Sequence, residues 1–170
     1  MKDMGLIENV GVSACAVEEA IKVLKDERFT IIQIPFNYLG NQWNNDEFKS
    51  LIQKRHDVEI HVRSIFSQGM LVNDFKHWPK IKEYDFEPTY DNITNLCKKY
   101  NLSKLELAVG HIKSAKWIDS ALFGVDNIEQ LKENIELHKN TNKLTDEILN
   151  EFICKFKDIP KELVNHVMWK

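Results

Sequence analysis

Polar side chains lie at or near the ends of several short β-branched runs in this sequence. Ser13 ends the first run, Gln33 lies near the end of the second, and Arg63 ends the third. The carboxyl ends of parallel strands meet at one rim of the sheet, where barrel enzymes bind their ligands. Polar groups at this rim are candidates for ligand contact. The structural alternative is that Ser13 caps the next turn, Gln33 is a satisfied polar residue in the sheet, and Arg63 forms a salt bridge.

The sequence contains no motif for several other common kinds of chemistry. The histidines form no HxxxH or HExxH pair, so no metal site is expected, and neither a GxSxG nor a Walker motif is present. Cys15, Cys97 and Cys154 are far apart and never in a CxxC pair. We expect three unpaired thiols in a reducing compartment, each buried as a small apolar side chain. The six histidines are at positions 56, 61, 77, 111, 138 and 166.

Length and composition predict a single domain over residues 1–170. Of these residues 43% are hydrophobic and 29% are charged, which is enough for a proper core. The 23 basic and 26 acidic residues leave a net charge of −3 with no Lys/Arg block, so nucleic acid is not an expected partner. No apolar run approaches about 18 residues and no secretory signal is present, which predicts no membrane contact and a cytoplasmic location.

The sequence alternates short β-branched runs with longer segments of helical period, the pattern of βα units and a parallel sheet. The second run is almost continuously apolar, as in a strand covered on both faces, and we expect Pro35 to end it. The expected strands are residues 9–13, 29–34, 58–63 and about 119–124.

Apolar stripes and capping residues predict the helices. A hydrophobic staple of Leu144 and Leu149 marks the start of the last helix, which we expect to end before Pro160. The expected caps are Asn44, Ser103, Asp126 and Thr145, the first three followed three residues on by Glu47, Glu106 and Glu129. The side chains expected to be buried are Val17, Ala20, Ile21 and Leu24; Phe48, Leu51 and Ile52; Ile93, Leu96, Cys97 and Tyr100; Leu105, Ala108, Val109 and Ile112; and Ile128, Leu131 and Ile135.

Four strands, each followed by a helix, make an α/β fold equal to half of a (β/α)8 TIM barrel. A complete barrel typically needs about 250 residues. We therefore expect a curved sheet of four parallel strands with two unpaired edges and an apolar face that must be hidden from water.

Four blocks of the sequence resemble the C-terminal half of the aldo/keto reductases, a family of NAD(P)H-dependent barrel enzymes. They resemble the fifth to eighth βα units of that family, in the right order, over nearly the whole chain. The blocks are GLIENVGVS at 5–13, IIQIPFN at 31–37, EIHVRSIFSQG at 59–69, and SALFGVD at 120–126 leading to EQLKEN at 129–134.

The resemblance implies a set of residues that bind NAD or NADP. Ser13 and Gln33 would hydrogen-bond the nicotinamide carboxamide, and Arg63 stands where many members stack an aromatic ring on the nicotinamide. The remaining residues are Ser64, Phe66 and Gln68, in a segment that resembles the pyrophosphate strap, and Gly124, Gln130, Glu133 and Asn134, which match the adenosine end. The strap residues also fit an ordinary loop.

The residues that clamp the 2′-phosphate in many NADP-dependent members are replaced here. Gly124, Val125 and Gln130 stand in place of Lys, Ser and Arg, and Asp126 adds a carboxylate. Because a charge-assisted hydrogen bond contributes about 1.5 to 3 kcal/mol, we expect no preference for NADP over NAD.

The family's catalytic Asp, Tyr, Lys and His would lie upstream of the GVS block, and twelve residues precede Ser13. We expect no catalytic residues in this chain and no activity from it alone. A small carbonyl substrate would be reduced only if an N-terminal half-barrel completed the site. The alternative is a non-enzymatic half-barrel that forms a homodimer and serves as a scaffold or nucleotide-binding module.

Overall fold

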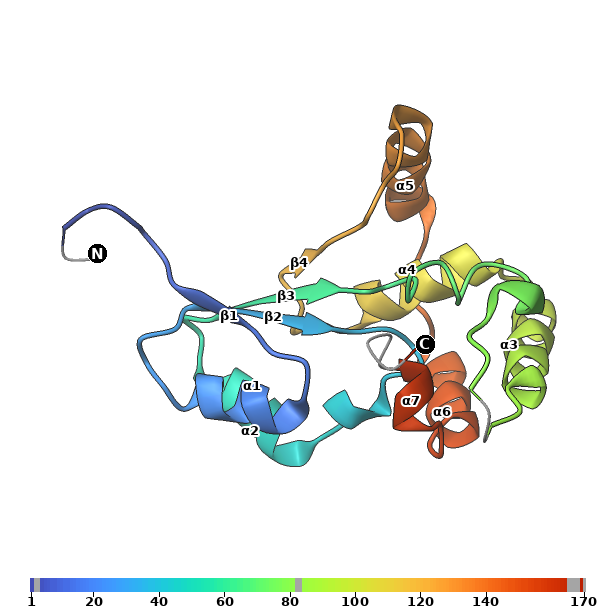
Figure 1. Cartoon of the computed structure of the whole chain (residues 1–170), viewed down its shortest axis with the longest axis horizontal. Coiled ribbons are helices and arrows are strands. Elements are labelled where there is room, and N and C mark those ends of the chain that lie inside the picture. The colour runs from blue at the N-terminus through green and yellow to red at the C-terminus, as the bar shows by residue number, and fades with distance from the viewer. Residues whose placement is uncertain (2–3, 82–83, 165–168, 170) are drawn as a thin grey trace.

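Four parallel strands form one sheet, and they pair in sequence order (Figure 1). The computed structural model describes residues 1, 4–81, 84–164 and 169. The strands are β1 (Gly11–Ser13), β2 (Ile31–Pro35), β3 (Glu59–Arg63) and β4 (Ser120–Ala121). The predicted half-barrel of alternating strands and helices is confirmed. The strands are shorter than expected, most of all β4, and Pro35 is the last residue of β2 rather than a stop before it.

Helices follow or connect all four strands. In Figure 1, α1 and α2 lie together below the sheet, α3, α4, α6 and α7 gather toward the carboxyl ends of the strands, and α5 stands apart. The helix that begins after Thr145 ends before Pro160 as expected, but another short helix follows it. The bounds are α1 (Val17–Leu24), α2 (Asp46–Lys54), α3 (Glu87–Tyr100), α4 (Lys104–Ser114), α5 (Ile128–Asn140), α6 (Asp146–Lys155) and α7 (Lys161–Val164), with 3-10 turns at Asn41–Trp43 and Phe75–His77.

Two of the four expected caps are confirmed. Ser103 and Glu106 form a reciprocal capping box at α4, and the Thr145 hydroxyl accepts the Ile148 N–H at α6. The other two were placed one residue too early. Asn45 caps α2, because Asn44 instead closes the preceding 3-10 turn.

Asn127, not Asp126, caps α5. Its side chain accepts the Gln130 N–H, while the Asp126 N–H donates to the Gln130 side chain at 2.8 Å. Asp126 and Gln130 are therefore bound to each other at the start of this helix.

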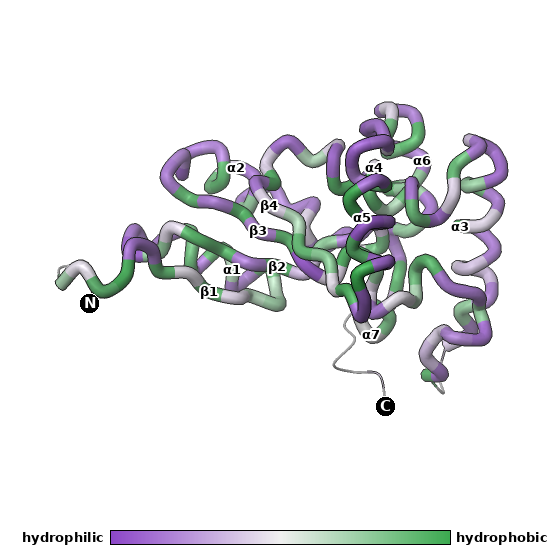
Figure 2. The backbone as a smooth tube through the Cα atoms, turned by 90° about the horizontal axis from the view of Figure 1, so that it is seen from above, coloured by the Kyte–Doolittle hydropathy of each residue, from purple (hydrophilic) through white to green (hydrophobic). Residues whose placement is uncertain are grey.

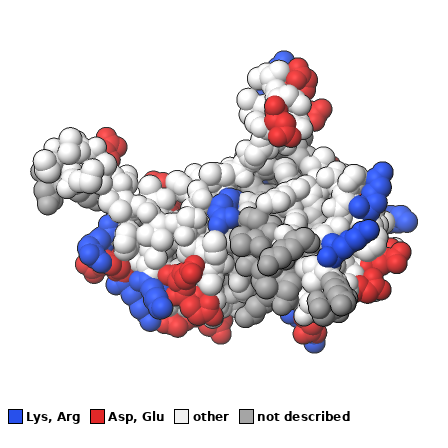
Figure 3. Space-filling view, in the orientation of Figure 1, with Lys and Arg blue, Asp and Glu red and all other residues white. Residues whose placement is uncertain are grey.

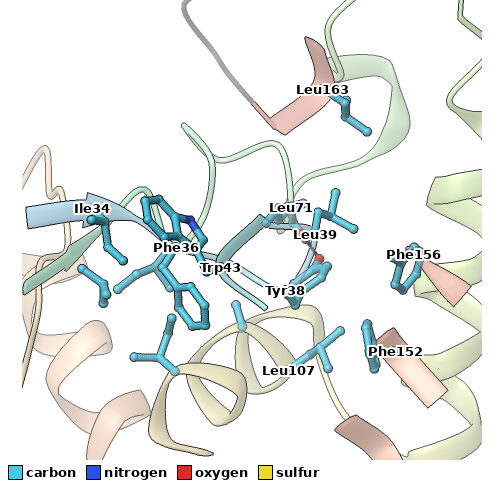
Figure 4. Packing of buried hydrophobic residues seen from close by; sticks show 14 of the residues in the cluster. Ile34, Phe36, Tyr38, Leu39, Trp43, Leu71, Leu107, Phe152, Phe156 and Leu163 are labelled. Carbon is cyan, nitrogen blue, oxygen red and sulfur yellow. Dashed lines mark hydrogen bonds between the residues drawn. The ribbon is translucent and has the colours of Figure 1, made fainter. Parts of the chain in front are cut away.

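The core lies on one face of the sheet and continues past the end of β2. Ile32, Ile34, Ile60 and Val62 are buried on that face. Figure 4 shows the segment after β2 packed between α4 and the C-terminal helices. There the Tyr38 hydroxyl donates to the Leu71 carbonyl at 3.1 Å.

The opposite face of the sheet is polar, which corrects two expectations. The register aligns Ser13, Gln33, His61 and Ser120 in one row across all four strands. These side chains are exposed or half-buried, so β2 is covered on one face only. The open face therefore has little of the apolar character that we expected of it. The apolar run of β2 predicted two covered faces, but Ile31, on the open face, is only partly buried.

The stripe of α5 is exposed instead of buried. Ile128, Leu131 and Ile135 expose 54%, 40% and 45% of their surface, and Leu105 on α4 exposes 40%. The helix projects from the body in Figures 1 and 3, and its apolar and polar turns alternate in Figure 2. It contacts α4, whose Lys113 donates to the carbonyls of His138 and Thr141, at 2.7 and 2.6 Å. Within the described chain nothing covers its apolar side.

All three cysteines are free, but only Cys97 is buried. Cys15 follows β1 at the exposed rim, and Cys154 lies on the exposed side of α6, which corrects the expectation that both would be buried. In the described part of the chain, no cluster of His, Cys, Asp or Glu side chains could hold a metal ion. No described helix is long and apolar enough to cross a membrane.

Candidate functional site

The carboxyl rim brings together residues from β1, β2 and β3. Ser13 and Gln33 are register partners on adjacent strands, and Arg63 is paired with Pro35 at the end of β2. The Arg63 guanidinium donates to the Cys15 thiol and to the Ser64 hydroxyl, each at 3.3 Å. No described carboxylate forms an ion pair with it, so the salt-bridge alternative for this arginine is not what the structure shows.

The loop after β3 has an unusual backbone. Ser64, Ser67 and Gln68 have positive φ values of 59°, 46° and 53°, in the left-handed region that non-glycine residues rarely adopt. Such strain persists where the surroundings determine the conformation, and it is common at ligand-binding segments. Here the buried Asn37 side chain donates to the Ser64 carbonyl at 3.3 Å and accepts the Leu39 N–H at 3.0 Å. The core below β2 thus holds the start of the loop.

A cavity of about 1160 Å³ lies between this loop, the segment after β4 and one side of α5. Phe66 and Phe123, which both line it, pack against each other with ring centroids 5.5 Å apart. Ser13 and Gln33 are not among its lining residues and lie on the open face of the sheet. The other eight predicted residues do line it: Arg63, Ser64, Phe66, Gln68, Gly124, Gln130, Glu133 and Asn134.

Further residues line the cavity that the sequence did not single out. Glu136 and Leu137 follow Glu133 by three and four positions, so the helical period alone could have found them. Val72 and Asn73 come from the loop after β3, and nothing in their types or spacing indicated this.

The cavity is more acidic than basic. Among its described lining residues Arg63 is the basic one, whereas Asp126, Glu133 and Glu136 are acidic. The same residues include no Tyr, Lys or His that could donate a proton to a substrate. The lining residues offer carboxylates, amides and one guanidinium for hydrogen bonds with a ligand.

A nicotinamide dinucleotide fits these lining residues. The volume is ample for a ligand of this size, since small-molecule pockets measure about 300 to 1000 Å³. Arg63 and Ser64 lie at the strand rim, and Glu133 and Asn134 lie on α5, so the cavity offers polar groups at two separate places. Phe66 and Phe123 supply apolar surface between the loop and the last strand.

These features define a class of protein: an α/β half-barrel whose carboxyl rim opens into a cavity lined by both polar and apolar side chains. The family model described as "Aldo/keto reductase family" matches residues 1–152, and the chain belongs to this family. No curated protein sequence matched the chain.

Solved aldo-keto reductases share the fold. Aldo-keto reductase AKR11C1 from Bacillus halodurans (holo form) matches with a TM-score of 0.68 and 23% identity, over 91% of this chain and 52% of that one. The glycerol dehydrogenase AKR11B4 from Gluconobacter oxydans matches with a TM-score of 0.66 and 18% identity, over 93% and 52%. The chain spans about half the length of these structures.

Proposed function

We propose that this chain is the dinucleotide-binding half of an aldo/keto reductase and holds the cofactor in the cavity beneath the loop after β3. The observation that carries the proposal is that one cavity gathers eight of the ten residues implied by the family resemblance. These eight residues come from the end of β3 and the loop after it, the segment after β4, and α5, which are well separated in sequence.

Each part of the cavity has a role in the proposal. Arg63 and the hydroxyl of Ser64 contact the nicotinamide side, and the backbone of the strained loop follows the pyrophosphate. Glu133 and Asn134 contact the adenosine end. When bound, the cofactor supplies two-electron redox chemistry toward a carbonyl group. The chain's own residues bind and orient it.

The proposal includes no preference of this cavity for NADP over NAD. A 2′-phosphate near α5 would face Asp126, Glu133 and Glu136, and the guanidinium of Arg63 is the only basic group among the described lining residues. Like charges in a partly desolvated cavity repel, so the 2′-phosphate adds a cost for NADP that NAD does not have.

We propose further that the chain alone binds the dinucleotide without reducing a substrate. The described lining residues include no Tyr, Lys or His, which supports this part of the proposal. Reduction of a small carbonyl compound would then require residues from a second polypeptide or an additional segment.

The test has two parts. The first is a calorimetric titration of the purified chain with NADH and with NADPH, and the second is an assay of reductase activity on a panel of aldehydes and ketones. We expect saturable binding of NADH, equal or weaker binding of NADPH, and no turnover above the rate without protein. Binding of neither dinucleotide would overturn the proposed site. A clear NADPH preference would overturn the cofactor assignment, and turnover would overturn the proposed inactivity.

A further inference from the structure

Exposed apolar side chains are concentrated in the segments that precede β1 and follow β4. Eleven large hydrophobic residues are exposed among the described residues, and eight of them flank β1 or β4. They are Met1, Met4 and Leu6 before β1, and Leu122, Val125, Ile128, Leu131 and Ile135 after β4. Scattered exposed apolar residues need no explanation, but a concentration at two sites marks an interaction surface.

Both outer strands have an open edge. β1 pairs only with β2 and β4 only with β3, so each presents unpaired backbone N–H and C=O groups within the described sheet. An open edge of this kind is a template for a further strand. Because the four strands are parallel, the β4 edge can accept a parallel β1 from another molecule.

The helices α5 and α1, which belong to the outer strands, also have a described helical neighbour on one side only. In a βα barrel each helix packs between the helix before it and the helix after it. α5 has α4 on one side, and no described helix on the other. Among the described helices, α1 makes its main contact with α2, on the side of β2. The apolar stripe of α5 and the β1 side of α1 are therefore each missing one neighbour.

The exposed area of the chain is larger than a compact monomer needs. A folded monomer of 20.0 kDa is expected to expose about 8,700 Å². This chain exposes 10607 Å². The excess is about 1,900 Å² per chain, or about 3,800 Å² for two chains, and obligate homodimers bury about 2,000 to 5,000 Å² in total.

We propose that a second copy of this chain covers these edges. β4 of each copy pairs in parallel with β1 of the other, and α5 of each packs its stripe of Ile128, Leu131 and Ile135 beside the partner's α1. A two-fold axis along the barrel then produces two identical joints and closes a ring of eight strands, which leaves no edge open.

Edge pairing is favoured over face-to-face stacking of two sheets, because stacking would leave the edges of β1 and β4 unpaired. In the closed ring the row of Ser13, Gln33 and His61 lies on the inner face, opposite the same row of the second copy, so that polar groups meet polar groups.

The test is sedimentation equilibrium of the full chain, compared with a variant of the α5 stripe and a matched control. We expect wild type at about 50 µM to have twice the mass of one chain. Leu131→Glu, which changes a side chain outside the cavity lining, should weaken dimerisation at least about tenfold. Ile153→Glu is the control, because Ile153 on α6 has nearly the same exposure, 41% against 40%, and lies away from both edges.

Each outcome decides the proposal without reference to dinucleotide binding. A monomeric wild type overturns it, and so does a Leu131→Glu variant that keeps the wild-type dimer. A monomeric chain that instead binds the N-terminal half of a reductase assigns the edges to that partner and also overturns it. Circular dichroism checks that Leu131→Glu is folded. If it is not, hydrogen exchange of wild type decides, since the β1 and β4 amides must exchange more slowly as the chain concentration rises.

Discussion

The guanidinium of Arg63 at the end of β3 lies 3.3 Å from the thiol of Cys15, which follows β1, although β2 lies between these two strands. The register explains this contact, because Arg63 is paired with Pro35, and continuing β1 by two residues from Ser13 places Cys15 in the same row. Arg63 therefore crosses the carboxyl end of β2 and links the rim of the sheet to the cavity, which it also lines.

Replacement of Arg63 tests its place in the cavity. Arg63→Ala should weaken NADH binding about tenfold or more, because a hydrogen bond to a charged group contributes about 1.5 to 3 kcal/mol. Calorimetric titration measures the change. Arg28→Ala is the matched control, since Arg28 is exposed and pairs with Asp26 away from the cavity. Unchanged NADH affinity in Arg63→Ala would remove this residue from the site.

A cation introduced on α5 should change the cofactor preference. Gln130→Arg places in the cavity an arginine, the residue that the resemblance implies for binding of a 2′-phosphate. It also removes the hydrogen bond that the Asp126 N–H donates to the Gln130 side chain. We expect NADPH affinity to rise about tenfold relative to NADH. Lys132→Arg on the same helix lies outside the described cavity lining and should change neither affinity. An equal gain for both dinucleotides would show that the phosphate is not bound here.

The order of the strands and most helices followed from the sequence, because apolar period and capping chemistry are local. Ser103 and Glu106 illustrate this, since two residues three positions apart suffice to predict the start of α4. The exposed stripe of α5 did not follow. Ile128 and Leu131 show that a helix has an apolar side, but only the neighbouring elements determine whether that side is covered.

The candidate site was predictable in its residues and not in its shape. The resemblance supplied the eight residues that line the cavity, and helical period would have added Glu136. Nothing in the sequence predicted the positive φ values at Ser64, Ser67 and Gln68, because these residue types seldom adopt that conformation. Their geometry depends partly on Asn37, a buried residue from the end of a different strand.

The half-buried histidine of α4 predicts how stability depends on pH. His111 stacks on Phe36 with ring centroids 5.1 Å apart, and burial lowers its pKa to about 4 from a usual value of 6.5. The unfolded chain therefore takes up this proton at a higher pH than the folded chain. Stability from the neutral imidazole is complete above about pH 6.5 and is lost as the pH falls toward 4.

His111→Phe should remove this dependence. Between pH 7.5 and pH 5, wild type should lose about 2 kcal/mol of unfolding free energy through this group alone. Urea denaturation at the two pH values measures the loss. His138→Gln, at an exposed position on α5, should keep the wild-type loss. An equal loss in His111→Phe would show that another group controls it.

The contact between α4 and the segment before α6 depends on the absence of a side chain at Gly110. A Cβ atom there would lie 2.8 Å from Leu144 Cδ2 and 2.9 Å from the Asn142 carbonyl oxygen. The segment cannot easily withdraw, because the Leu144 N–H donates to the Ser114 hydroxyl at 2.8 Å, and that hydroxyl donates to the Gly110 carbonyl at 2.7 Å.

Two opposing effects determine the stability of Gly110→Ala. Alanine favours a helix over glycine by about 1 kcal/mol. Overpacking against a fixed backbone costs about 1 to 3 kcal/mol. We expect the steric cost to exceed the helical gain and the urea midpoint to fall. In Gly124→Ala, where a Cβ meets nothing within 4 Å, the unfolding free energy should stay within about 0.5 kcal/mol of wild type. A midpoint for Gly110→Ala above that of wild type would mean that α4 and the 142–144 segment can separate without cost.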